Sequence, residues 1–252
     1  MATFEEELKK IHPVLERLCN FMILGKKIVV KGSENFLREG PNIIVGNHIG
    51  TFKDIATIYK IVPRPVFFTA NKLIFDKKDF DNLIRKHFHR HLKSFGPFFN
   101  LIIGPLKSRL INFVSSNIGK VGTIPVDLSK KKSMALEKCQ EYLKEGKAII
   151  TLQGWGRVMS SDSNPYVMPF RKGASILTYK LYRKEGISVP VTPVAIFGTH
   201  IPFPIPGKIK VNIGKPMYIT DYMSDSLLAT VNRFRKAMED RVKALFIELL
   251  RE

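Results

Sequence analysis

Hydrophobic positions along the chain alternate between short β-branched runs and longer stretches with helical spacing. The short runs predict strands at residues 27–31, 43–45, 65–68, 121–127, 147–152, 189–197 and 208–213. The helical spacing predicts helices at residues 55–61, 81–95 and 133–145, a helix that ends near residue 183, and a long helix at 227–250. Because strands and helices alternate throughout, we expect an α/β fold with a mixed, mostly parallel sheet covered by helices on both faces.

The N-terminal segment has the pattern of an amphipathic helix. Apolar residues recur at helical spacing from Ile11 to Met22, and the acidic run Glu5 to Glu7 suits the positive end of a helix dipole. Such a helix docks on a domain or lies in a membrane interface, and the pattern fits both. We therefore expect residues 1–25 to form a helical segment ahead of one α/β domain at residues 26–252.

The stretch from residue 42 to residue 55 carries the first candidate chemistry. A buried strand ends in a glycine turn at Gly46, His48 follows at once, and Asp54 stands just before the next apolar run. A histidine at a strand end with a carboxylate beyond it can act as a general base whose tautomer the carboxylate fixes. The alternative is that Asp54 is the N-cap of the following helix.

The charge of the chain points to an anionic partner. A formal net charge of +19 and a pI near 9.9 fit nucleic acid, acidic lipid headgroups or phosphorylated substrates. The sequence has no helix-turn-helix, RNA-recognition or zinc signature, so we expect no specific nucleic acid.

A basic helix is predicted at residues 81–95, and an apolar run follows it. This combination suits either a surface that presses into anionic lipid or an ordinary pair of core helices with a solvated basic face. Within the helix His87 and His91 have the spacing of two metal ligands. No third ligand has convincing spacing, so we expect no metal.

The cysteines and the absence of a serine nucleophile motif indicate the compartment of the protein and the kind of reaction to expect. The chain has 2 cysteines, Cys19 and Cys139, both in helical patterns, which favours a reducing compartment. No Gly-x-Ser-x-Gly elbow is present, which argues against an acyl-enzyme route.

The N-terminus lacks the pattern of a secretory signal. The longest apolar run, 95–114, is broken by glycine, proline and charged residues, so we expect a protein that does not span a membrane.

Two later stretches have the chemistry of anion binding. Gly154 and Arg157 follow a predicted strand, where glycine permits close backbone approach and an arginine can grip a phosphate. Arg171 and Lys172 precede a predicted helix, whose free amide groups and dipole favour negative charge.

Taken in order, these stretches resemble the motifs of the glycerolipid acyltransferase family, whose best-known members are the 1-acyl-glycerol-3-phosphate acyltransferases. The resemblance spans roughly residues 26 to 220. It rests on Asn47-His48 with Asp54, Gly122 to Asp127, Gln153 to Arg157, Pro169 to Ala174, and Val191 to Ala195.

The resemblance implies an acyltransferase domain at residues 26–252. In it a fatty acyl group moves from a thioester of coenzyme A or acyl carrier protein, as co-substrate, to a hydroxyl of a lysophospholipid or glycerol-phosphate acceptor. No bound cofactor is implied. His48 would be the base, Asp54 its orienter and Arg157 a phosphate ligand. We expect further substrate contacts from the remaining matched residues, which are Asn47, Gln153, Gly154 and Lys172. The enzyme would work peripherally on an anionic membrane surface, at its cytoplasmic face.

The chain departs from the family's pattern at three points. Five residues, Ile49 to Lys53, separate His48 from Asp54 where the family has four, so the link must be a turn rather than a regular helix. Leu128 stands where the family has an arginine. Gln153 replaces the usual glutamate, and Trp155-Gly156 replaces a single threonine.

Two other functions fit the same sequence. One is a basic nucleic-acid-binding protein, which the charge allows. The other is a lipid-binding protein that has lost catalysis through the longer His48–Asp54 spacing.

Overall fold

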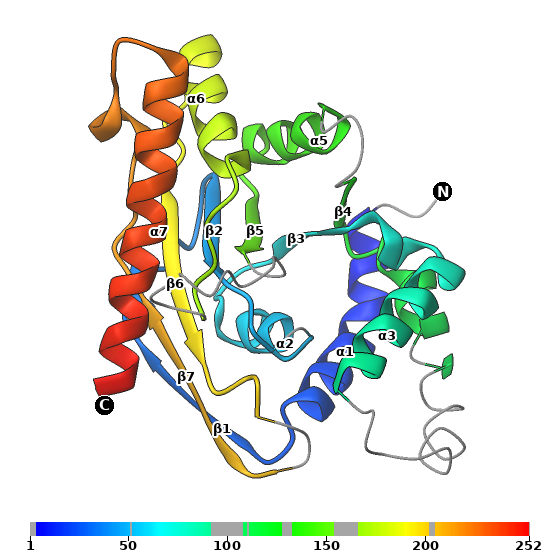
Figure 1. The fold of residues 1–252 in the computed structure, drawn as a ribbon. Helices are drawn as coiled ribbons and strands as arrows, with labels where there is room; N and C mark the ends of the chain where they lie inside the picture. Colours follow the sequence, from blue (N-terminus) through cyan, green and yellow to red (C-terminus); the bar gives the residue numbers. More distant parts are fainter. Residues whose placement is uncertain are drawn as a thin grey trace. The chain divides into compact units, whose positions relative to one another are not determined.

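Five strands form a mixed, mostly parallel sheet in the order β1-β7-β6-β2-β5 (Figure 1). All neighbouring strands run parallel except β6 and β7, which are antiparallel. The predicted mixed, mostly parallel sheet is therefore confirmed. The strands are β1 (Lys26–Lys31), β2 (Asn42–Asn47), β5 (Ala148–Gln153), β6 (Val191–Phe197) and β7 (Gly207–Ile213).

The structure, a computed structural model, describes residues 4–50, 52–91, 108–109, 111–127, 133–153, 166–201 and 205–251. The chain forms two compact units, and the five-stranded sheet belongs to the one built from residues 12–67 and 136–252. The other unit comprises residues 1–11 and 68–135. The predicted division of the chain at residue 25 stays a prediction.

Helices cover both faces of the five-stranded sheet, as predicted. Helix α7 packs across β6, β7 and β2, and α6 lies against α7. Figure 1 shows α2 and α5 on the opposite face. These helices are α2 (Phe52–Ile61), α5 (Ser133–Lys144), α6 (Gly173–Glu185) and α7 (Leu227–Arg251), and the short 3-10 helices η1 (Ser33–Asn35) and η3 (Ile219–Tyr222) lie in the connections.

The smaller unit contains a parallel strand pair and a helix. Residues 69–71 of β3 (Val66–Asn71) pair with β4 (Ile124–Val126). The 3-10 helix η2 (Lys72–Phe75) and helix α3 (Lys77–His91) follow β3. The N-terminal helix α1 (Phe4–Met22) forms as the amphipathic pattern predicts, with Pro13 inside it.

Burial explains why the central strands have uninterrupted apolar runs. Ile43, Ile44 and Val45 of β2 are at most 1% exposed, because sheet neighbours flank the strand and helices cover it above and below. Strand β1, at the edge of the sheet, instead alternates between half-buried and exposed residues. The sequence patterns of β2 and β1 thus indicated which strand lies in the middle of the sheet and which lies at its edge.

Three predicted boundaries were wrong. Helix α2 begins at Phe52, so Asp54 lies in its first turn and is not its N-cap. Helix α3 begins four residues earlier than predicted, because the Asp76 carboxylate accepts a hydrogen bond from the Asp79 backbone N–H (2.9 Å) and caps it. The predicted strand at 121–127 is reduced to β4, because Gly122 adopts a positive φ of 71° in a turn before it.

Metal sites and membrane spans are absent from the part of the chain that the structure describes. No helix there is long and apolar enough to cross a bilayer. No group of three or more His, Cys, Asp or Glu residues there could hold a metal ion. The side chains of His87 and His91 and the apolar run after α3 lie outside the described residues.

Candidate active site

The turn from β2 to α2 brings His48 and Asp54 into contact. His48 follows directly on the last residue of β2, and Asp54 projects from the first turn of α2. The distance between His48 Nδ1 and Asp54 Oδ2 is 2.8 Å, and the Asp54 side chain is 0% exposed whereas that of His48 is 21% exposed. Because an ionised carboxylate only accepts hydrogen bonds, Nδ1 carries the proton and Nε2 is left as the basic nitrogen. Nε2 makes no hydrogen bond to any described residue.

Gly50 allows the turn to close over the longer spacing. Its backbone N–H donates to Asp54 Oδ2 at 2.7 Å, so one carboxylate oxygen holds both the turn and the imidazole. A Cβ atom at Gly50 would lie 2.3 Å from the Cβ of Thr199, closer than real Cβ contacts come. Only glycine therefore lets the turn pack directly on Thr199, and the extra residue does not separate His48 from Asp54.

Replacing Gly50 by alanine is expected to disturb both the fold and the His48–Asp54 contact. Thr199 or the turn must move to admit the methyl group, which should lower the free energy of unfolding by about 2 kcal/mol. Urea denaturation measures this loss. Gly119→Ala is the matched control, since a Cβ atom there meets nothing within 4 Å. Equal stability of the two variants would contradict the close packing of Gly50 on Thr199.

Asn47 anchors the end of β2 to β6. Its side chain is 0% exposed. Asn47 Nδ2 donates to the Ile196 carbonyl (2.9 Å) and to the Tyr166 carbonyl (3.3 Å), and its Oδ1 accepts from the Ile196 N–H (2.8 Å). The amide of Asn47 thus extends the sheet and fixes the backbone from which His48 projects. Its predicted contact with substrate stays a prediction.

Gln153 joins the end of β5 to the segment before α6. It is the register partner of Asn47, so β5 ends beside the residue that precedes His48. Its Oε1 accepts from the Arg171 backbone N–H (3.1 Å), and its Nε2 donates to Thr151 Oγ1 (3.0 Å). The first turn of α6 is thereby held at the edge of the sheet from which His48 projects.

Of the other predicted substrate contacts, one lies at this edge and two cannot be placed. Lys172 is exposed and is the residue before the first turn of α6. Gly154 and Arg157 lie outside the described residues. The structure thus brings together His48, Asp54, Asn47 and Gln153, with Lys172 on the adjoining helix end.

Glu239 of α7 is a residue of this region that the sequence reasoning missed. It is 4% exposed, and its Oε2 accepts from the Phe170 backbone N–H and from Arg235, both at 3.0 Å. Its Oε1 accepts from Lys243 at 2.9 Å. Arg235 also donates to the Phe170 carbonyl (3.3 Å). Together with Gln153, the side chains of α7 hold successive backbone groups ahead of α6. An acidic residue on the apolar face of a helix, with Arg and Lys four residues either side, was the available signal.

Replacing Glu239 by glutamine is expected to lower the free energy of unfolding by about 2 kcal/mol, because charged hydrogen bonds to a buried group are lost. Burial alone would raise the pKa of Glu239, but hydrogen bonds from Lys243 and Phe170 outweigh it and lower the pKa. A carboxyl whose pKa is lower in the folded state stabilises it at neutral pH and loses that contribution as the pH falls through the folded value.

The difference in stability between parent and Glu239→Gln should therefore shrink on acidification, which urea titrations at several pH values measure. Asp240→Asn is the matched control, since Asp240 is exposed and pairs with Lys236 at 2.6 Å on the helix surface. If the stability of Glu239→Gln follows that of the control at neutral pH, the buried network contributes nothing.

Positive groups gather around Asp54. Lys53 donates to the Ile201 carbonyl and Lys26 to the Ile205 carbonyl. Burial lowers the pKa of Lys53, and the neighbouring Lys26 lowers it further. Burial and the same two lysines also lower the pKa of His200, against the opposing effect of Asp54. Lys53 and Lys26 thus add positive charge near the His48–Asp54 pair.

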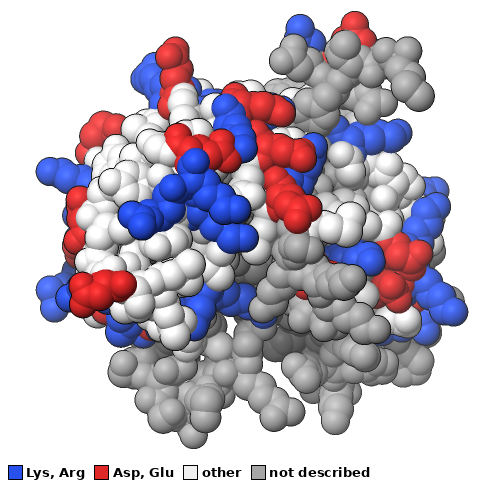
Figure 2. Space-filling model, turned by 90° about the horizontal axis from the view of Figure 1, so that it is seen from above, with Lys and Arg blue, Asp and Glu red and all other residues white. Residues whose placement is uncertain are grey.

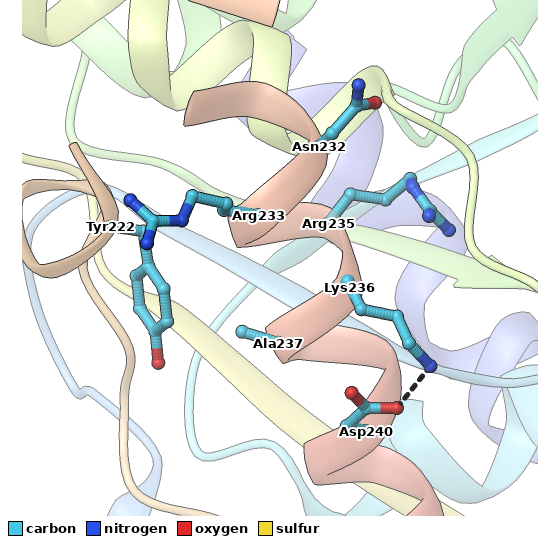
Figure 3. A pocket seen from close by; sticks show the side chains of 7 residues that line it. All are labelled: Tyr222, Asn232, Arg233, Arg235, Lys236, Ala237 and Asp240. Carbon is cyan, nitrogen blue, oxygen red and sulfur yellow. Dashed lines mark hydrogen bonds and ion pairs between the residues drawn. The ribbon is translucent and has the colours of Figure 1, made fainter. Parts of the chain in front are cut away.

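A hollow on the outer face of α7 does not coincide with this site. It has a volume of about 570 Å³ and is open to solvent (Figure 3). In Figure 3 Arg233 points toward Tyr222, and Lys236 pairs with Asp240. None of the predicted site residues lines it. The lining residues are Tyr222, Asn232, Arg233, Arg235, Lys236, Ala237 and Asp240.

Neither cysteine is placed to act as a nucleophile. Cys19 and Cys139 are both buried and free. Burial raises the pKa of Cys19 to about 11 and that of Cys139 to about 12, so both remain thiols at neutral pH. The imidazole of His48 is therefore the better candidate for the reacting group.

Comparison with known proteins identified a solved structure with a similar fold. Neither a scan of family models nor a search of curated proteins gave a match. A search of solved structures found the crystal structure of the 1-acyl-sn-glycerophosphate (LPA) acyltransferase PlsC from Thermotoga maritima. The alignment has a TM-score of 0.59 and 22% identity, and covers 100% of this chain and 85% of that one. The predicted resemblance to glycerolipid acyltransferases is confirmed for the fold.

Proposed function

We propose that this protein is an acyltransferase that moves a fatty acyl group from an acyl thioester to a hydroxyl of a lysophospholipid or glycerol-phosphate-type acceptor. The observation that carries the proposal is the 2.8 Å contact between His48 Nδ1 and the buried carboxylate of Asp54 at the end of β2. The fold shared with an LPA acyltransferase supports the same reaction class.

The orientation of the imidazole supports direct acyl transfer with His48 as the general base. His48 Nε2 takes the proton of the acceptor hydroxyl as its oxygen attacks the thioester carbonyl carbon. Asp54 stabilises the imidazolium that forms, and backbone N–H groups stabilise the negative charge on the carbonyl oxygen. When the tetrahedral intermediate collapses, the carbon–sulfur bond breaks and the thiolate takes the proton back from His48. No covalent acyl-enzyme is needed.

The charge near the site supports an acceptor that carries a phosphate. Lys172 and the first turn of α6, with Arg157 from the adjoining segment, would hold the phosphate of the acceptor. Coenzyme A or acyl carrier protein would carry the acyl group, and the protein itself would bind no cofactor. We propose that the enzyme works as a peripheral protein at the cytoplasmic face of an anionic membrane.

A mass-spectrometric screen of the unmodified protein tests this proposal. Acyl-CoA and acyl-carrier-protein donors are offered against a panel of lysophospholipids and glycerol 3-phosphate. We expect a mass increase of one acyl group on at least one acceptor. If every pair fails while the protein still binds lysolipid, the non-catalytic lipid-binding alternative is favoured instead.

A further inference from the structure

The Lys and Arg side chains do not form a separate patch on every face of the molecule. On the face shown in Figure 2, Lys and Arg side chains lie among Asp and Glu side chains rather than in a separate patch. A different distribution is found on the strands β1 and β7, which Figure 1 shows at one edge of the sheet.

The parallel register of β1 and β7 places lysines side by side. Lys27 lies beside Lys208, and Val29 lies beside Lys210. Residues in register point to the same face of a sheet, and so do residues two apart along a strand. These four residues therefore share one surface, which we call the lysine face, and Lys31 lies on the same side.

The lysine face lies beside the C-terminal half of α7. Lys210 Nζ donates to the Leu249 carbonyl and Asn212 Nδ2 to the Leu245 carbonyl, both at 3.2 Å, so this side of β7 is the one that α7 meets. Lys27 and Lys208 are exposed, and Val29 is 41% exposed. Helix α7 thus leaves the outer part of this face open to solvent.

Protection of the sheet edge does not account for these lysines. Lysine on an edge strand prevents pairing with another chain, which would explain Lys27 on β1. Strand β7, however, lies between β1 and β6, and it carries Lys208 and Lys210 on the same face. Like charges directly opposite each other in a sheet are destabilising. The pair Lys27 and Lys208 therefore has a cost in stability that edge protection leaves unexplained.

The lysine face begins at the edge of the sheet that carries His48. Because β7 is antiparallel to β6, the amino ends of β7 and β1 lie beside the carboxyl end of β6. Phe197, the last residue of β6, is opposite Lys210, and the preceding residue, Ile196, is hydrogen-bonded to Asn47. A membrane that touches the lysine face would thus approach the edge at which a lipid substrate is needed.

We propose that the lysine face docks on an anionic phospholipid surface. This proposal rests on the proposed function, because a lipid substrate requires the enzyme to contact a membrane. Lysine ammonium groups act as point charges toward a layer of lipid phosphates, and Val29 offers an apolar side chain among them. The lysine face has no aromatic residue on which bases could stack, which disfavours a single-stranded nucleic acid.

The double variant Lys27→Gln/Lys208→Gln tests the proposal by cosedimentation with phosphatidylcholine vesicles, with and without phosphatidylglycerol. Each lysine near an anionic membrane contributes about fivefold to binding, so the variant should bind anionic vesicles about 25-fold more weakly than the parent. Lys27→Arg/Lys208→Arg keeps the charge and should bind as the parent does. Removal of the opposed charges should leave the thermal midpoint of Lys27→Gln/Lys208→Gln unchanged or raised, so a folding defect is not expected.

Lys138→Gln/Lys184→Gln is the matched control, since it removes two charges from α5 and α6. Equal loss of binding in the control and in Lys27→Gln/Lys208→Gln would overturn the proposal. Equal binding of the parent to both kinds of vesicle would also overturn it. The proposal would likewise be overturned if Lys27→Gln/Lys208→Gln lost binding to duplex or single-stranded RNA while its vesicle binding stayed unchanged. Vesicle binding needs no turnover, so it decides the docking surface even if the acyl-transfer screen fails. Conversely, acyl transfer between water-soluble substrates should be equal in parent and double variant.

Discussion

Replacing His48 by alanine is expected to lower kcat/KM for acyl transfer by about 10³-fold, the middle of the range for losing a general base. The hydroxyl of the acceptor then has no group to take its proton as it attacks the thioester. Because the imidazole is 21% exposed and its one hydrogen bond to a described residue is to Asp54, the fold should survive the change. Thiol release from an acyl-CoA donor measures the loss.

His12→Ala is the control for the loss of an imidazole. The His12 ring packs against Tyr59, with ring centroids 5.8 Å apart, and has no carboxylate partner in the described structure. Its removal should leave turnover close to that of the parent. Activity of His48→Ala within tenfold of the parent would exclude His48 as the base and leave the binding alternatives standing.

Replacing Asp54 by asparagine is expected to lower kcat/KM by about 10³-fold with little effect on folding. The amide can keep the size and position of the carboxylate, so the turn survives, but an amide NH2 can donate to His48 Nδ1 and no longer fixes the tautomer. The negative charge that stabilises the imidazolium is lost, and removal of that charge from a histidine–carboxylate pair is costly to turnover.

The stability of Asp54→Asn separates catalysis from structure. Asp54 is 0% exposed, and its Oδ1 has no hydrogen-bond partner among the described residues, so burying the charge is unfavourable for folding. Urea denaturation should therefore show a free energy of unfolding equal to or above that of the parent. A variant that unfolds easily and yet turns over normally when folded would show that Asp54 serves only the helix.

The sequence was sufficient wherever the signal was local. Runs such as Ile43 to Val45 identified buried strands, and the spacing of apolar residues identified α5, α6 and α7. His48 and Asp54 were found because both lie in one turn, and Gly50 indicated that the turn could close. Boundaries of helices were less certain, since the cap at Asp76 depends on a single side-chain hydrogen bond.

Only the tertiary structure showed which polar residues hold the fold together and which remain available to contact a substrate. Asn47 and Gln153 look alike in the sequence as strand-end amides beside a motif, yet their amides bond to Ile196 and Arg171 from distant segments. Glu239 acquires its role only when α7 meets the segment before α6.

The lysine face is likewise invisible in one dimension, because it arises from the register of two strands that are about 180 residues apart in the chain. A sequence encodes the period of each element, so fold class and the local turn chemistry can be derived from it. It does not state which strand lies beside which, or which helix packs on which segment, and these pairings bring together residues far apart in the chain.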